Sequence, residues 1–129
     1  RYRAFPYLHE EISAAFSAAD LALARAGASV LGELPHFGLP AILVPYPYAW
    51  RYQKENADYL VGKGAAVLLA DENLSKNLTA SVRHLMRDGE KRNQMRRAMA
   101  SIAHPKAASA IVALVVQSAR KEGVKGSEP

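Results

Sequence analysis

Three short apolar runs, separated by helical segments, constrain the fold of this chain more than any other feature. The runs are "LALA" at 21–24, "AILVP" at 41–45 and "AAVLL" at 65–69. No charged residue interrupts them, which is typical of strands that are buried on both faces of a parallel sheet. Because a helical segment lies between successive runs, the order predicts an α/β fold, a Rossmann-like parallel sheet with helices on both faces.

The segment at 28–38 shows how the helices are recognised. Its apolar side chains fall at a helical spacing, at Val30, Leu34 and Phe37. Pro35 removes one helical hydrogen bond and should kink or shorten the last turn, and Gly38 can cap the end. The remaining helices are expected at 10–20, 52–63, 75–87, 89–101 and about 106–121.

Composition limits the classes of function. The 129 residues suffice for one domain, and they include no cysteine, so disulfides and thiolate metal sites are excluded. The four histidines (His9, His36, His84 and His104) show no ligand spacing, so we expect no metal site. No apolar run is long enough to cross a bilayer.

The net charge of +5 is compatible with an anionic partner. Eight basic residues lie in the second half: Lys76, Arg83, Arg87, Lys91, Arg92, Arg96, Arg97 and Lys106. No aromatic residue interleaves them as a base-stacking surface would require, so we interpret them as a solvated face and expect no nucleic-acid binding. Residues 1–121 are expected to form the domain and 122–129 a flexible tail, and the opening "RYRAFPYL" suggests a fragment of a longer protein.

The turn after the first predicted strand is the candidate binding site. Arg25, Ala26 and Gly27 form the turn, and the next helix is expected to start near Ala28. Free N–H groups at a helix N-terminus bind phosphate, and Gly27 would let the backbone approach a ligand. Ser29 and Glu33 share one helix face, where the carboxylate could accept hydrogen bonds from ribose hydroxyls. The alternative is a tight strand-to-helix turn with Glu33 in solvent.

Several motifs around this turn resemble a known family. They are Ala19 and Asp20, Arg25 to Ala28, Glu33, Gly38 to Pro45, and Gln53 to Ala57. Together they are similar to the C-terminal domain of the glycosyltransferases (family 28) that transfer N-acetylglucosamine from UDP-GlcNAc to lipid I. The resemblance covers roughly residues 7 to 120. It implies the incomplete C-terminal, donor-binding half of an enzyme with the two-domain GT-B fold.

The resemblance also implies roles for single residues in binding the donor UDP-GlcNAc. Arg25 and Gly27, in the turn, would be among the donor-binding residues. The backbone amides of Ala28, Ser29 and Val30 would bind the phosphates, and Glu33 would bind both ribose hydroxyls. Gln53 would contact the sugar hydroxyls, and Asn56 would support the site. Leu8 and His9 would hold the uracil.

Two departures from the family pattern affect the site. Val30 stands where a threonine is common, so one hydroxyl near the phosphates is missing. Trp50 and Tyr52 stand where the family has an acidic and a polar residue, so the sugar contacts can differ, and Tyr52 could stack on a pyranose ring.

The resemblance implies that the catalytic base lies in an N-terminal domain outside this sequence, so we expect no catalytic residue among these 129 residues. It implies inverting transfer to the muramyl sugar of lipid I, without a cofactor or metal. The intact enzyme would be cytoplasmic and peripheral on the inner face of the cell membrane. Two alternatives remain: a related UDP-sugar transferase with another lipid acceptor such as diacylglycerol, and a non-catalytic nucleotide-binding module.

Overall fold

The computed structural model describes residues 2–48 and 52–125. A parallel sheet lies at its centre, with the strands in the order β1 (Ala22–Ala24), β2 (Ala41–Leu43) and β3 (Ala66–Leu68). In the register, Ala22 pairs with Ala41, and Ala41 pairs with Ala66. The order of strands and helices and the parallel pairing confirm the predicted α/β fold.

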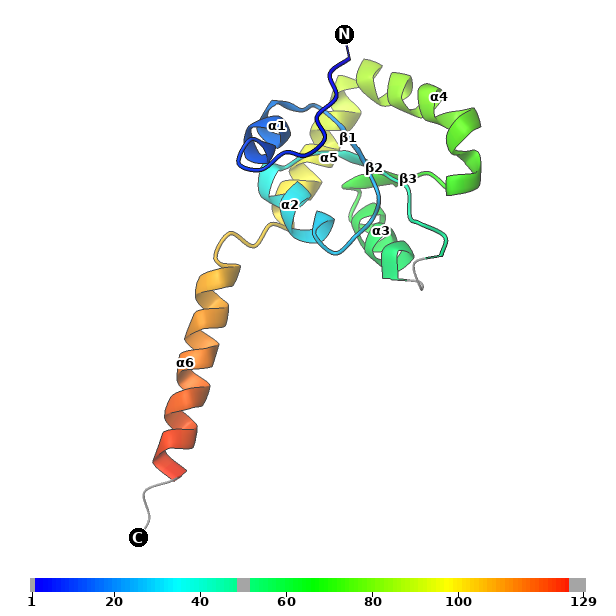
Figure 1. Ribbon diagram of the computed structural model, residues 1–129. Coiled ribbons are helices and arrows are strands. Elements are labelled where there is room, and N and C mark those ends of the chain that lie inside the picture. The colour runs from blue at the N-terminus through cyan, green and yellow to red at the C-terminus, as the bar shows by residue number, and fades with distance from the viewer. Residues whose placement is uncertain (1, 49–51, 126–129) are drawn as a thin grey trace.

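The described residues form seven helical elements, and Figure 1 shows all of them except the last gathered around the strands. They are α1 (Ile12–Ala18), α2 (Val30–Phe37), α3 (Tyr52–Gly62), the 3-10 turn η1 (Asp71–Asn73), α4 (Leu74–Arg87), α5 (Gly89–Ser101) and α6 (Ala107–Lys125). The helix between each pair of strands carries the chain back to the start of the next parallel strand.

Two apolar clusters show that helices cover both faces of the sheet. On one face, Leu34 of α2 and Leu60 of α3 pack in the cluster that contains Leu43 of β2. On the other face, Leu85 of α4 packs in the cluster that contains Ile42. Alternate residues of β2 therefore face opposite layers, which explains why its apolar run is continuous.

Glycines in the left-handed conformation end the two helices that precede β2 and β3. Gly38 has a φ of 57° and Gly64 a φ of 72°. After α2, the Leu39 N–H donates to the Leu34 carbonyl oxygen at 2.9 Å, and after α3 the Ala65 N–H donates to the Leu60 carbonyl oxygen at 3.0 Å. These hydrogen bonds, typical of a Schellman motif, satisfy the last carbonyl groups of a helix. The predicted cap at Gly38 is confirmed, and α2 ends two residues after Pro35.

The last helix lies apart from the α/β body. Figure 1 shows α6 projecting away from the sheet and its covering helices. Four of its apolar side chains are 60–62% exposed: Ile111, Val112, Leu114 and Val115. The helix runs to Lys125, four residues beyond the expected end at 121. In the part of the chain that the structure describes, no helix is long and apolar enough to span a bilayer.

Candidate functional site

The turn between β1 and α2 presents open backbone amides. The first α-helical bond joins the Glu33 N–H to the Ser29 carbonyl oxygen at 2.9 Å, so α2 begins at Val30 and not near Ala28 as expected. The Val30 N–H donates to the Gly27 carbonyl oxygen at a long 3.3 Å. Within the described residues, the N–H groups of Ala28 and Ser29 have no acceptor. These groups can bind an anion at a helix N-terminus.

The backbone near this turn leaves room for a ligand. A Cβ atom added to Gly27 would meet no described atom within 4 Å, and Ser29 is exposed. The Ser29 side chain makes no capping hydrogen bond, so its hydroxyl is available together with the amides. The turn therefore has both an open approach and unused donors.

Glu33 of α2 lines a pocket that it shares with the N-terminal segment and α1. The pocket has a volume of about 460 Å³, and Leu8 and His9 line it together with Glu33. Its other lining residues are Tyr7, Ile12 and Phe16. Val30 and Leu34 are buried in the core instead, as the helical spacing predicted. The structure thus brings together three of the predicted site residues from two distant segments of the chain.

Helix α3 supports the site through two side-chain amides. The Asn56 Nδ2 group donates to the carbonyl oxygen of Ala26, in the β1–α2 turn, at 3.0 Å. The Gln53 Oε1 atom accepts a hydrogen bond from the Tyr46 N–H at 2.9 Å. The Gln53 oxygen is therefore used within the protein, and its NH₂ group is the part that could bind a ligand.

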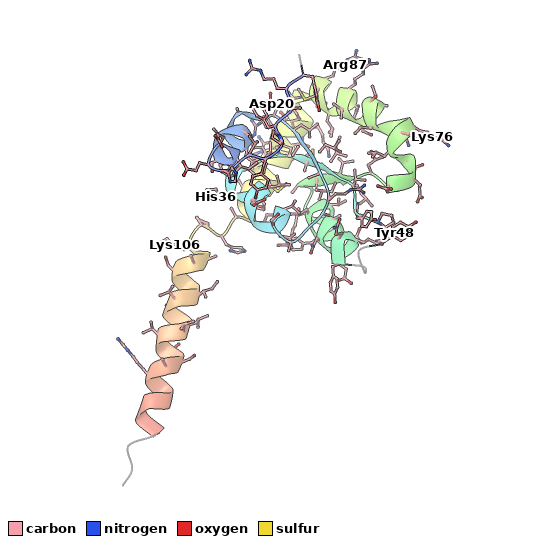
Figure 2. The ribbon with its side chains drawn as sticks, in the orientation of Figure 1. Asp20, His36, Tyr48, Lys76, Arg87 and Lys106 are labelled. Carbon is pink, nitrogen blue, oxygen red and sulfur yellow. The ribbon has the colours of Figure 1, made fainter. Side chains whose placement is uncertain are left out.

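The aromatic loop before α3 is open to solvent. Tyr52 is 71% exposed, and the rings of Tyr46 and Tyr48 lie edge to face at 5.6 Å between centroids. Figure 2 shows Tyr48 on this loop. Trp50, the other aromatic residue that departs from the family pattern, lies outside the described residues.

Arg25 binds other protein groups at the carboxyl edge of the sheet. Its Nη1 atom donates to the carbonyl oxygen of Val44 at 3.3 Å and forms an ion pair with Asp71. Its guanidinium also lies 5.4 Å from the ring centroid of Tyr46. Asp71 was not among the predicted site residues, although its position two residues after the third apolar run could have suggested a polar group at this edge.

The basic residues of the second half lie mainly at the surface. Figure 2 shows Lys76 and Arg87 of α4 at the edge of the molecule, and both are exposed. Arg92 is an exception, because its Nη1 atom donates to the carbonyl oxygens of Leu85 and Met86 at 2.5 Å and so closes the end of α4. Across residues 2–48 and 52–125, no group of three His, Asp or Glu side chains could hold a metal ion.

At the carboxyl edge of the parallel sheet, the N-terminus of α2 is open, and the carboxylate of Glu33 lies one helical turn further along. α/β domains typically bind ligands at this edge. The chain matches the glycosyltransferase family 28 C-terminal domain over residues 1–111. It therefore belongs to this family, and the resemblance drawn from the motifs is confirmed.

Relatives of known name support the assignment. A UDP-N-acetylglucosamine–N-acetylmuramyl-(pentapeptide) pyrophosphoryl-undecaprenol N-acetylglucosamine transferase of Roseiflexus is 42% identical, over 89% of this chain and 30% of its own length. A protein of the same name from Desulforudis audaxviator is 43% identical, over 90% of this chain and 31% of its own.

A solved structure is similar as well. The crystal structure of Acinetobacter baumannii MurG superimposes with a TM-score of 0.80 at 27% sequence identity, over 89% of this chain and 33% of that protein. The chain thus spans about a third of the length of the proteins it matches.

Proposed function

We propose that this chain is the donor-binding part of a transferase that moves N-acetylglucosamine from UDP-GlcNAc to the muramyl sugar of lipid I and so forms lipid II. The observation that carries the proposal is the position of Glu33. Its carboxylate lies one turn beyond the open amides of Ala28 and Ser29, and it borders the same pocket as Leu8 and His9. The names of the relatives support the choice of donor and acceptor.

The diphosphate would bind at the start of α2. The N–H groups of Ala28 and Ser29 would donate to phosphate oxygens, and the positive end of the helix dipole would favour the negative charge. The Val30 N–H could join them, because its bond to Gly27 is long at 3.3 Å. The Ser29 hydroxyl supplies a side-chain donor in the region where the family commonly has the threonine that Val30 replaces.

The nucleoside would occupy the pocket beside α2. Both ribose hydroxyls would donate to the Glu33 carboxylate, since hydrogen bonds to a charged acceptor are the stronger kind. The uracil would lie against Leu8 and His9, which line the same pocket. The sugar would extend toward α3, where the Gln53 NH₂ group is available and Tyr52 presents an exposed ring.

The reaction would be an inverting displacement. The C4 hydroxyl oxygen of the muramyl sugar would form a bond to C1 of N-acetylglucosamine while the bond from C1 to the phosphate oxygen breaks. A base outside this chain would take the hydroxyl proton, and the departing UDP would keep the electron pair. The α2 amides would stabilise the charge that develops on the diphosphate. Since lipid I lies in a membrane, we propose that the whole enzyme associates peripherally with the inner face of the cell membrane.

Calorimetric titration of the chain with UDP-GlcNAc, UDP-glucose and UDP tests the proposal. We expect UDP-GlcNAc to bind best, and Glu33→Ala to weaken it by about tenfold or more, because a hydrogen bond to a charged group is worth roughly 1.5–3 kcal/mol. Glu90→Ala is the matched control, because it also removes an exposed acid from the first turn of a helix.

The outcomes separate the alternatives. A preference for UDP-glucose would indicate a transferase with another sugar. Binding of all three ligands that is insensitive to Glu33→Ala would contradict the ribose assignment. Absence of binding by a chain with a cooperative unfolding transition would contradict donor binding by these residues alone.

A further inference from the structure

Arg25 joins the ends of three strands at one edge of the sheet. It follows β1, its Nη1 atom donates to the Val44 carbonyl oxygen just beyond β2, and it pairs with Asp71 just beyond β3. Asp71 is 46 residues away in the sequence, so this junction exists only in the folded chain. The side chains of Arg25 and Asp71 are 46% and 34% exposed, which leaves the pair partly protected from solvent.

The same guanidinium reaches the loop before α3. It lies over the ring of Tyr46 at 5.4 Å from the centroid, within the range of a cation–π interaction. The backbone N–H of Tyr46 donates to Gln53 at 2.9 Å. Tyr46 is therefore held on its ring by Arg25 and on its backbone by Gln53.

These contacts argue against a direct role of Arg25 at the diphosphate. A guanidinium that pairs with a carboxylate and donates to a carbonyl group has little unbalanced charge to offer an anion. Its partners Val44 and Tyr46 instead begin the loop that leads to Gln53, the residue assigned to the sugar.

We propose that Arg25, held by Asp71, is a positioning residue that orders Tyr46 against Gln53 and thereby sets recognition of the sugar part of the donor. The inference rests on the proposed function for the identity of the ligand. Its structural half, the ordering of Tyr46 by the Arg25–Asp71 pair, does not depend on any ligand.

Hydrogen exchange of the Tyr46 amide, followed by NMR on the 129-residue chain without ligand, tests the structural half. We expect Arg25→Ala and Asp71→Ala each to speed exchange by roughly three- to tenfold, and the double variant to be little faster than either single one, because the two residues act as one unit. The controls are Arg97→Ala and Glu90→Ala, which break an exposed ion pair of α5 at 3.3 Å. Unchanged Tyr46 exchange in the Arg25 and Asp71 variants would overturn the proposal, whether or not any nucleotide binds.

Titration with UDP and UDP-GlcNAc tests the functional half. We expect Asp71→Asn to leave UDP affinity within about twofold and to reduce the advantage of UDP-GlcNAc over UDP by about fivefold or more, on the order of one lost charge-assisted hydrogen bond. If Arg25 bound the diphosphate directly, Asp71→Asn would free its charge and tighten UDP binding, which would contradict the proposal. Compared with Arg25→Ala, Arg25→Lys should restore part of the selectivity for UDP-GlcNAc over UDP, since lysine keeps the charge but not the planar group.

The two measurements also distinguish the two levels of inference. If the unmodified chain binds no nucleotide while Tyr46 exchange responds to Arg25→Ala and Asp71→Ala, the proposed function fails and the positioning role of the pair stands. If the chain binds UDP-GlcNAc and neither exchange nor selectivity responds, the positioning role fails and the donor assignment stands.

Discussion

At the scale of single residues, hydrogen bonds decide what each polar side chain of the site can do. The Gln53 oxygen is used by the Tyr46 N–H, and the Asn56 amide is used by the Ala26 carbonyl group. Glu33 makes no such contact among the described residues and borders a pocket. The polar residues of α3 are therefore partly structural, whereas Glu33 is available to a ligand.

The Asn56 bond should contribute measurably to stability. Replacing Asn56 by alanine would leave the carbonyl group of Ala26, a fully buried residue, without this donor. We expect the free energy of unfolding to fall by about 1 kcal/mol, the usual net value of such a bond. Urea denaturation measures the change. Asn77→Ala on the exposed surface of α4 is the control, and equal losses in the two variants would contradict a specific role for Asn56.

At the scale of elements, the helix ends set where the strands begin. Gly38 and Gly64 adopt positive φ angles directly before the segments that enter β2 and β3. A residue with a side chain is strained in this conformation, so glycine allows the chain to reverse direction there. The reversal returns the chain to the sheet at the start of β2 and of β3.

Two glycines of the same helix region should respond in opposite directions to alanine. Gly38→Ala puts a side chain on a backbone with a φ of 57°. The added Cβ atom would lie 3.6 Å from its nearest neighbour, so the loss comes from backbone strain and not from a steric clash. We expect a loss of about 1 kcal/mol. Gly32→Ala lies inside α2 with no neighbour within 4 Å, and we expect a gain of about 0.5–1 kcal/mol from helix propensity. Thermal unfolding measures the stability of both variants. Changes of the same sign would contradict the different backbone requirements of Gly38 and Gly32.

At the scale of the whole molecule, the chain consists of an α/β body and a projecting helix. The body has apolar clusters on both faces of its sheet, whereas the apolar side chains of α6 are exposed. Figure 1 shows that α6 leaves the body after α5. The stability of the body should therefore not depend on α6.

Removal of residues 107–129 tests this independence. We expect the midpoint of thermal unfolding to change by less than about 4 °C, the shift that roughly 1 kcal/mol causes in a domain of this size. The truncated chain should also associate less at high concentration, because it loses a row of exposed apolar side chains. Calorimetry and sedimentation measure the two effects. A large drop in the midpoint would mean that α6 packs on the body in solution.

Local sequence patterns predicted the succession of elements and the parallel class of the sheet. Apolar runs and helical spacing are local signals, and the parallel pairing follows from the rule that a helical crossover joins parallel strands. The motifs of the β1–α2 turn likewise indicated the family, and Gly38 indicated its own cap. Boundaries were less certain: α2 begins at Val30 and α6 ends at Lys125, because frayed turns and tertiary support decide where a helix stops.

Which distant groups meet depends on the packing of the folded chain. The separation of 46 residues between Arg25 and Asp71 hides their ion pair from any local pattern, and the shared pocket of Glu33, Leu8 and His9 depends on how α1 packs beside α2. The contacts of the Arg25 guanidinium with Asp71 and the Val44 carbonyl group likewise exist only in the folded chain. Local sequence encodes backbone conformation through sterics and periodicity, whereas the partner of a long polar side chain is set by packing across the whole fold.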